Sequence, residues 1–102
     1  MQFEWHIKKN HLNKKKHGLS FEMASFVFED PFLFSVLDYR HRHNEERWIS
    51  LGLIQESLIY VAHTMKEDEE NGEEIIRIIS ARQATPSETR RYYANRKNDE
   101  RI

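Results

Sequence analysis

The sequence predicts an α+β, two-layer domain in which an antiparallel sheet of about four strands packs against two N-terminal helices and one C-terminal helix. Three observations lead to this expectation. Apolar residues recur at helical spacing before Pro31, runs rich in β-branched and aromatic residues follow from Phe32 to Arg82, and the last segment opens with a helix-capping pattern. Strands joined by short loops pair antiparallel, and the helices must then cover one face of the sheet.

Length and composition bound the class of protein. The 102 residues suit one small core, so we expect residues 1–102 to form a single domain. Hydrophobic residues make up 38% of the chain and charged residues 32%, a balance typical of soluble globular proteins. The lack of cysteine excludes disulfides and thiolate chemistry and fits a reducing compartment. Since neither a membrane span nor a signal-peptide core is visible, we expect a cytoplasmic protein without a membrane partner.

The N-terminal third of the chain predicts one strand and two helices. Residues 2–5, QFEW, alternate apolar and polar side chains as a short strand does. Residues 6–17 are good helix formers with few large apolar side chains, and Gly18 is a favoured C-cap residue. A second helix begins after Ser20, which can cap it, and Pro31 prevents its continuation.

The middle of the chain changes from helical to strand periodicity. Strands are predicted over residues 32–38, 47–55, 57–65 and 75–82. A polar loop separates the first two, a tight turn at Gln55 and Glu56 joins the next two, and the acidic loop 66–74 precedes the last. The final helix starts at Pro86 with a capping box formed by Thr85 and Glu88.

Two arginines stand inside the last predicted strand. Arg77 and Arg82 are five positions apart, so a regular strand points them to opposite faces, and at most one lines the open face unless a bulge intervenes. A guanidinium stays charged, and its planar fork of donors matches a phosphate. Each arginine therefore needs either a bound anion or an internal carboxylate, such as Glu46 or Glu74, and both interpretations stay open.

The chain contains the groups that RNA cleavage without a metal requires. These are a base for the 2′-hydroxyl, an acid for the leaving 5′-oxygen and positive charge for the phosphorane-like transition state. His63 lies on an apolar strand face, where a histidine is more often a core residue than a proton carrier. A sufficient set is Glu46, Arg47, His63, Arg77, Arg82 and a tyrosine at position 92 or 93.

Charge and histidine patterns give weaker signals. Basic segments near both ends of the chain could form one positive face for a polyanion if the fold brings them together, or could be solvated helix surface. His41 and His43 stand two apart in a polar loop, and more histidines lie near the N-terminus, but no cysteine or HExxH pair completes a metal site. We therefore expect neither a metal nor a cofactor.

Four stretches of the chain carry a family resemblance. They are FEWHIKKNHLNKKKHGLSFEMASFVFEDP, EERWISLGL, LIYVAHT and IIRIISARQATPSETRRYY, and they cover nearly the whole sequence. Their most specific parts are KHGLSFEMA, EERW, and RIISARQAT followed by RRYY. Together these stretches resemble the BrnT toxins of bacterial type II toxin–antitoxin modules.

The resemblance implies a compact RelE-like fold and RNA cleavage that arrests translation. It also implies neutralisation by a BrnA-type antitoxin, which binds operator DNA through a ribbon-helix-helix part, in an assembly of two toxins and two antitoxins. On the family's pattern, Glu46 or His63 serves as acid or base, while Arg47, Arg77 and Arg82 hold the scissile phosphate. Flanking RNA would be held by Lys14, Lys15, Lys16, Arg90, Arg91 and Tyr92.

An alternative reading of the same arginines is a non-catalytic binding module. In that reading Arg77 and Arg82 pair with an acidic segment of a partner protein and cleave nothing. The acidic loop 66–74 departs from the family's pattern. It argues against RNA approaching from that side and suits a contact with the antitoxin instead.

Overall fold

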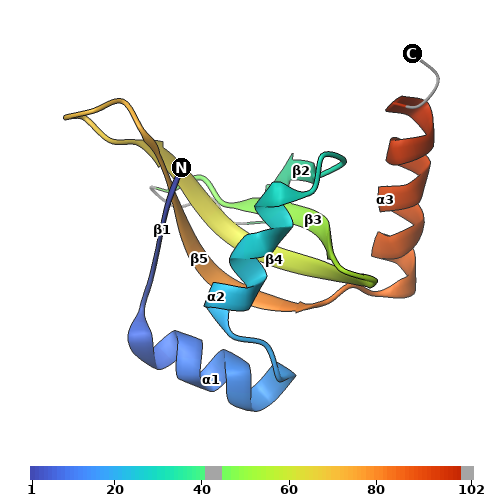
Figure 1. The fold of residues 1–102 in the computed structure, drawn as a ribbon, viewed down its shortest axis with the longest axis horizontal. Helices are drawn as coiled ribbons and strands as arrows, with labels where there is room; N and C mark the ends of the chain where they lie inside the picture. The colour runs from blue at the N-terminus through green and yellow to red at the C-terminus, as the bar shows by residue number, and fades with distance from the viewer. Residues whose placement is uncertain (41–44, 100–102) are drawn as a thin grey trace.

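The computed structural model describes residues 1–40 and 45–99, and within these ranges the chain forms one five-stranded sheet with helices packed against it (Figure 1). The predicted pair His41 and His43 lies outside the described residues. Across the sheet the strands are ordered β1 (Gln2–Trp5), β5 (Glu74–Gln83), β4 (Ser57–Glu67), β3 (Trp48–Ile54) and β2 (Phe34–Leu37). The helices are α1 (Ile7–His17), α2 (Phe21–Ala24), the 3-10 helix η1 (Ser25–Glu29) and α3 (Pro86–Asp99). None of the helices in the described ranges is long and apolar enough to cross a membrane.

Most local signals in the sequence are confirmed. Gly18 ends α1 in the left-handed region at φ 70°, and the Ser20 hydroxyl accepts a hydrogen bond from the Met23 amide at the start of α2. The capping box of α3 forms in both directions, because the Glu88 amide donates to Thr85 Oγ1 and the Thr85 amide donates to Glu88 Oε1.

The expected sheet of about four antiparallel strands is wrong at one edge. Strand β1 pairs with β5 in parallel, from Gln2 opposite Ile75 to Trp5 opposite Ile78, and makes the sheet mixed. Phe3 and Trp5 pack against the main apolar cluster from this edge. Burial of these two rings stabilises the pairing of β1 with β5. Periodicity along the sequence could not specify this partner.

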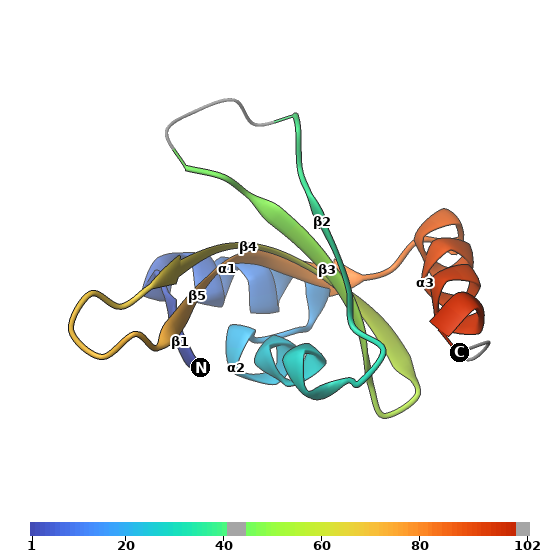
Figure 2. The ribbon, with the colours of Figure 1, turned by 90° about the horizontal axis from the view of Figure 1, so that it is seen from above.

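The sheet has two different faces. Its inner face carries Ile59, Val61 and Ile78 and packs against apolar residues of α2 and η1, including Phe21 and Val27. Its outer face carries Leu51 and Tyr60, which pack with Tyr92 of α3. The expectation that all helices cover one face is therefore wrong for α3, and Figures 1 and 2 show α3 set apart from α1 and α2.

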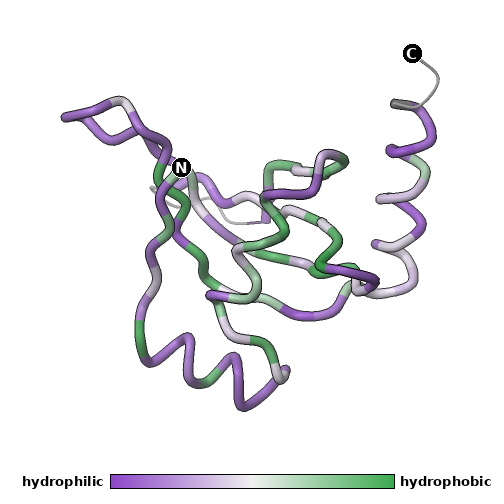
Figure 3. The backbone as a smooth tube through the Cα atoms, in the orientation of Figure 1, coloured by the Kyte–Doolittle hydropathy of each residue, from purple (hydrophilic) through white to green (hydrophobic). Residues whose placement is uncertain are grey.

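Helix α1 is attached to the sheet mainly through a polar side chain. Figure 3 shows α1 as largely hydrophilic, in keeping with its exposed lysines. The buried Asn13 amide donates to Ala81 O at 2.8 Å and to Leu19 O at 2.9 Å, and it accepts from Ala81 N at 3.1 Å. Because β1 pairs with β5 at Ile75 to Ile78, the Asn13 side chain takes the place of a strand partner at Ala81.

A β-bulge interrupts the pairing of β4 and β5. Ala62 lies opposite Ser80 and His63 lies opposite Ile78, so Ile79 is an extra residue in β5. The extra residue changes which side chains share a face. On the outer face, Arg82 lies opposite Tyr60 and Arg77 lies opposite Thr64. The bulge that the sequence left open is present, and it places both arginines on one side of the sheet.

We predict that Asn13→Ala lowers the free energy of unfolding by about 2–3 kcal/mol. The substitution removes the hydrogen-bond partner of two buried backbone groups, the N–H and the C=O of Ala81. Urea unfolding followed by circular dichroism measures the change. Lys15→Ala, an exposed substitution in the same helix, should stay within about 0.5 kcal/mol of the parent chain. Equal stability of the two variants would contradict the role given to Asn13.

Candidate functional site

A cleft on the outer face gathers the strongest candidates for binding an anion. Its volume is about 590 Å³, and its apolar floor includes Phe34, Ile49 and Leu51 of β2 and β3. Charged side chains complete the lining, from the loop after β2, from β5 and from α3. They are Asp38, Arg40, Arg82, Glu88 and Arg91. The cleft thus combines arginines with aromatic and aliphatic surface.

Arg82 is held in place by contacts on two sides. Its guanidinium lies 3.8 Å from the centroid of the Tyr60 ring. It also donates to both carboxylate oxygens of Glu88, at 2.8 Å and 3.0 Å. These hydrogen bonds lower the pKa of Glu88 and raise that of Arg82, so the pair stays ionised. About a third of the Arg82 side chain remains exposed, which leaves it accessible from the cleft.

Arg40 and Arg91 add charge around the same cleft. Arg40 donates to both oxygens of the buried Asp38 carboxylate, at 2.9 Å and 3.0 Å, while most of its side chain stays in solvent. Hydrogen bonding to Asp38, with a smaller contribution from Tyr60, raises the pKa of Arg40. Arg91 lies over the Phe34 ring, 5.4 Å from its centroid. Loop, strand and helix therefore direct positive charge to one hollow.

Arg77 belongs to a neighbouring cavity on the same face. That cavity, of about 280 Å³, is lined by Glu4, Glu45, Glu46 and Lys66 as well as Arg77. The strand partners of Arg82 and Arg77 are Tyr60 and Thr64, four positions apart on β4, so the two arginines are separated by roughly 13 Å along the strand. They share a face but line different cavities.

His63 lies on the inner face, away from this cleft. The ring is fully buried, and Phe28 packs against it with the ring centroids 5.0 Å apart. Nδ1 is 3.3 Å from Thr64 O, a carbonyl that can only accept, so Nδ1 carries the proton and Nε2 accepts from Ser50 Oγ at 2.6 Å. Burial lowers the pKa of His63 to about 4. The imidazole is a neutral core group with no path to an anion on the outer face.

The predicted catalytic set is therefore not brought together. Arg82 lines the cleft, Glu46 and Arg77 line the neighbouring cavity, and His63 is buried behind the sheet. Arg47 is half-buried directly before β3, where its carbonyl accepts from the Asp38 amide at 2.8 Å. Arg47 thus fixes the backbone beside the cleft through its carbonyl group.

The predicted RNA-binding residues lie on two separate helices. Lys14, Lys15 and Lys16 are exposed on α1, which Asn13 fixes at the edge of β5, whereas Arg90 and Arg91 lie on α3, set apart from α1 (Figure 1). The fold therefore does not bring these basic segments together into one positive face among the described residues. Tyr92 is fully buried, and its hydroxyl donates to Asp30 Oδ2 at 2.5 Å. Burial, together with that carboxylate, raises the pKa of Tyr92, and the geometry assigns it to anchoring α3.

Several cleft residues were not identified from the sequence. Asp38 was counted as the last residue of a predicted strand and Arg40 as part of a polar loop. Tyr60 was counted as an ordinary strand residue, and Glu88 was recognised only as part of the helix cap. The signal for Glu88 was its position, since a capping glutamate just after a strand that ends in Arg82 can also reach that arginine. In the described part of the chain, no group of three or more His, Cys, Asp or Glu side chains is placed to hold a metal ion.

Comparison with known proteins gives one positive finding. The model of one protein family, described as the ribonuclease toxin, BrnT, of type II toxin-antitoxin systems, matches residues 5–88. The match begins at Trp5, the last residue of β1, covers β2 to β5 and ends at Glu88 in the first turn of α3. No curated protein matches the chain significantly.

We predict that His63 makes stability fall as the pH is lowered from about 6.5 to about 4. In this window His63 is protonated in the unfolded chain but stays neutral in the folded chain, so the free energy of unfolding drops by up to roughly 3 kcal/mol. Well above pH 6.5 the imidazole is neutral in both states and adds no pH dependence.

Urea unfolding of the parent chain and of His63→Gln between pH 4.5 and 7.5 measures this contribution. The variant should show a shallower loss of stability toward acid. Parallel curves for the two proteins would show that His63 titrates normally in the folded chain.

Proposed function

The chain belongs to the BrnT family of ribonuclease toxins of type II toxin–antitoxin systems, and we propose that it cleaves RNA internally, without a metal ion, at the outer-face cleft. The observation that carries this proposal is the convergence of Arg40, Arg82 and Arg91 on one hollow with an aromatic floor. Guanidiniums fixed before the substrate arrives can stabilise the charge that develops on a phosphorane-like transition state.

Arg82 is assigned to the scissile phosphate. Stacking on Tyr60 fixes the plane of its guanidinium, and Glu88 occupies its fork of donors when no phosphate is bound. The two non-bridging oxygens of a phosphodiester can replace the two Glu88 carboxylate oxygens as acceptors for the guanidinium fork. Tyr39, which is 76% exposed at the edge of the cleft, offers a ring on which an unpaired base can stack, as single-stranded RNA requires.

Proton transfer is assigned to side chains in the same cleft. Once the phosphate holds Arg82, the released Glu88 carboxylate takes the proton of the 2′-hydroxyl, whose oxygen attacks phosphorus. The bond from phosphorus to the 5′-oxygen then breaks, the Tyr60 hydroxyl supplies a proton to that oxygen, and a 2′,3′-cyclic phosphate remains. Arg77, on the same face, is assigned to a flanking phosphate. Its neighbour Glu46 and the buried His63 are left out of the proposed chemistry.

The proposal includes the partner that the family description calls for. A type II module pairs the toxin with a protein antitoxin, and we propose a BrnA-type antitoxin with a ribbon-helix-helix part that contacts operator DNA. Two copies of each chain would form the assembly, and the toxin fold would be of the RelE type. A small ribbon-helix-helix protein encoded in the adjacent reading frame would support this pairing.

The internal ion pairs give some support to a second function. Because Arg82 and Arg40 already hold carboxylates, their partners in the cell could be acidic side chains of another protein rather than phosphates. A binding module of this kind leaves cellular RNA intact. RNA cleavage by the parent chain and by an Arg82 variant separates the two functions. A binding module without ribonuclease activity shows no cleavage in either protein.

We predict that Arg82→Ala lowers the rate of RNA cleavage by roughly 100-fold or more, because it removes fixed positive charge from the transition state. Arg82→Lys should recover little of the loss, since an ammonium cannot replace the fork. Lys97→Ala serves as control, because Lys97 is exposed on α3 outside the cleft lining. Cleavage of a labelled single-stranded RNA by purified proteins is the measurement. Full activity in Arg82→Ala would refute the assignment of the site.

We predict that cleavage persists in excess EDTA and that the 3′ ends of the products carry a cyclic phosphate. Both results follow from attack by the 2′-hydroxyl, which uses side chains of the cleft for proton transfer and charge. Total RNA, with and without chelator, is incubated with the pure protein, and product ends are identified by mass spectrometry. Activity that disappears with EDTA and returns with added magnesium would contradict the metal-free reaction.

A further inference from the structure

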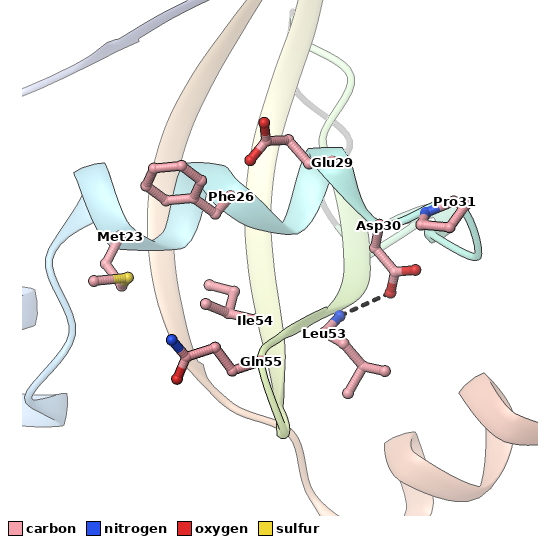
Figure 4. A pocket seen from close by; sticks show the side chains of 8 residues that line it. All are labelled: Met23, Phe26, Glu29, Asp30, Pro31, Leu53, Ile54 and Gln55. Carbon is pink, nitrogen blue, oxygen red and sulfur yellow. Dashed lines mark hydrogen bonds between the residues drawn. The ribbon is translucent and has the colours of Figure 1, made fainter.

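An apolar groove lies away from the RNA cleft, between η1 and the turn that joins β3 to β4. Figure 4 shows Met23 and Phe26 on one wall and Leu53 and Ile54 on the other. The groove has a volume of about 570 Å³. Met23 is 48% exposed and Phe26 is 51% exposed, although both are large apolar residues. Methionine and phenylalanine are enriched at protein interfaces, so this wall has the composition of a binding surface.

The groove continues into a second cavity toward the end of α1. That cavity, of about 210 Å³, is also lined by Met23, Ile54 and Gln55, and it extends to His17 and Gln83. The shared residues make the two cavities one trough, which runs from Pro31 to His17. Two acids line the trough. Asp30 already accepts hydrogen bonds from the Leu53 and Phe32 amides, whereas Glu29 is exposed. The walls formed by Met23, Phe26, Leu53 and Ile54 suit apolar side chains.

The shape of the trough favours a helix as its occupant. An extended peptide binds by adding a strand to a free sheet edge, but little free edge remains here, because β2 pairs with β3 up to Leu51 and the Leu53 amide beyond it donates to Asp30 Oδ2. Binding along this trough therefore depends on side chains. An amphipathic helix, with apolar residues at positions i, i+4 and i+7, presents such side chains in one row.

The charges at the two ends of the trough orient this helix. At one end His17 lines the trough, and Lys14, Lys15 and Lys16 share the last turn of α1 with it. At the other end stands the exposed carboxylate of Glu29. An acidic first turn suits the lysine end and a basic last turn suits Glu29, which is also the arrangement that the helix dipole favours.

We propose that the antitoxin docks an amphipathic helix in this trough, with its acidic N-terminal turn beside Lys14 to Lys16 and its basic C-terminal turn beside Glu29. The inference rests on the proposed function, because it takes the partner to be the antitoxin of the module. The α1 lysines lie outside the lining of the RNA cleft, and the proposal gives them a role in protein recognition.

The test measures binding of the antitoxin encoded by the adjacent reading frame, using isothermal titration calorimetry with the purified full chain. Phe26→Asp should weaken binding at least about tenfold, because it places a charge in the apolar wall. The matched control is Leu12→Asp, an apolar residue that is 66% exposed on α1 outside the trough, and it should change affinity less than twofold. Circular dichroism confirms that each variant is folded.

A second pair of variants tests the orientation. Glu29→Lys should weaken binding several-fold, with a larger effect at low salt, whereas Glu22→Lys, an exposed residue of α2 outside the trough lining, should not. Unchanged affinity in both Phe26→Asp and Glu29→Lys would overturn the proposal. A second result would also overturn it: Phe26→Asp binds the antitoxin normally but no longer self-associates in sedimentation. The trough would then be an interface between two copies of this chain.

RNA cleavage by the isolated variants keeps this inference separate from the proposed function. Phe26→Asp alone should cleave RNA at the parental rate while escaping the antitoxin. If the parent chain binds the antitoxin but cleaves no RNA, the ribonuclease assignment fails and the docking result stands by itself. If the parent chain does not bind the product of the adjacent reading frame, the docking proposal is overturned, whatever the cleavage result.

Discussion

The bulge at Ile79 decides which side of the sheet Arg82 faces. A regular β5 would place Arg82 on the face of Ile76 and Ile78, which forms the apolar core against α2 and η1. Burial of an unpaired guanidinium there costs several kcal/mol, more than a bulge does. With one extra residue, Ala81 joins the core and Arg82 moves to the outer face, where Tyr60 and Glu88 receive it. The fold and the candidate site thus satisfy the same constraint.

The two faces of the sheet carry different surface features. The outer face has a cleft with fixed arginines, whereas the inner face carries the core and, at its margin, the apolar trough. The bond from Tyr92 to Asp30 links these regions, because Asp30 lines the trough and Tyr92 anchors the helix that supplies Glu88 and Arg91. This separation leaves room for RNA and a protein partner on different surfaces of one small domain.

The sequence was sufficient for elements with a local physical cause. Gly18, Ser20 and the Thr85 to Glu88 capping box were correctly placed, because caps depend on a few neighbouring residues. The parallel pairing of β1 depends on a strand some 70 positions away in the chain, and no local pattern encodes it. The same limit applied to α3, whose face was decided by the distant bond between Tyr92 and Asp30. For the candidate site, Arg82 was predicted from the sequence and lines the cleft. The bulge places Arg82 and His63 on opposite faces of the sheet, and the sequence did not specify it.

The outer-face site is tested most directly by an NMR titration of the folded chain with a short 2′-O-methyl RNA, which binds but cannot attack its own phosphate. We expect the side-chain signals of Arg82 and Arg91 and the ring signals of Tyr60 to shift together and saturate, while the signals of His63 and of the α1 lysines do not shift. Saturable shifts centred on His63 or on Lys14 to Lys16, with Arg82 unaffected, would contradict RNA binding at the outer-face cleft.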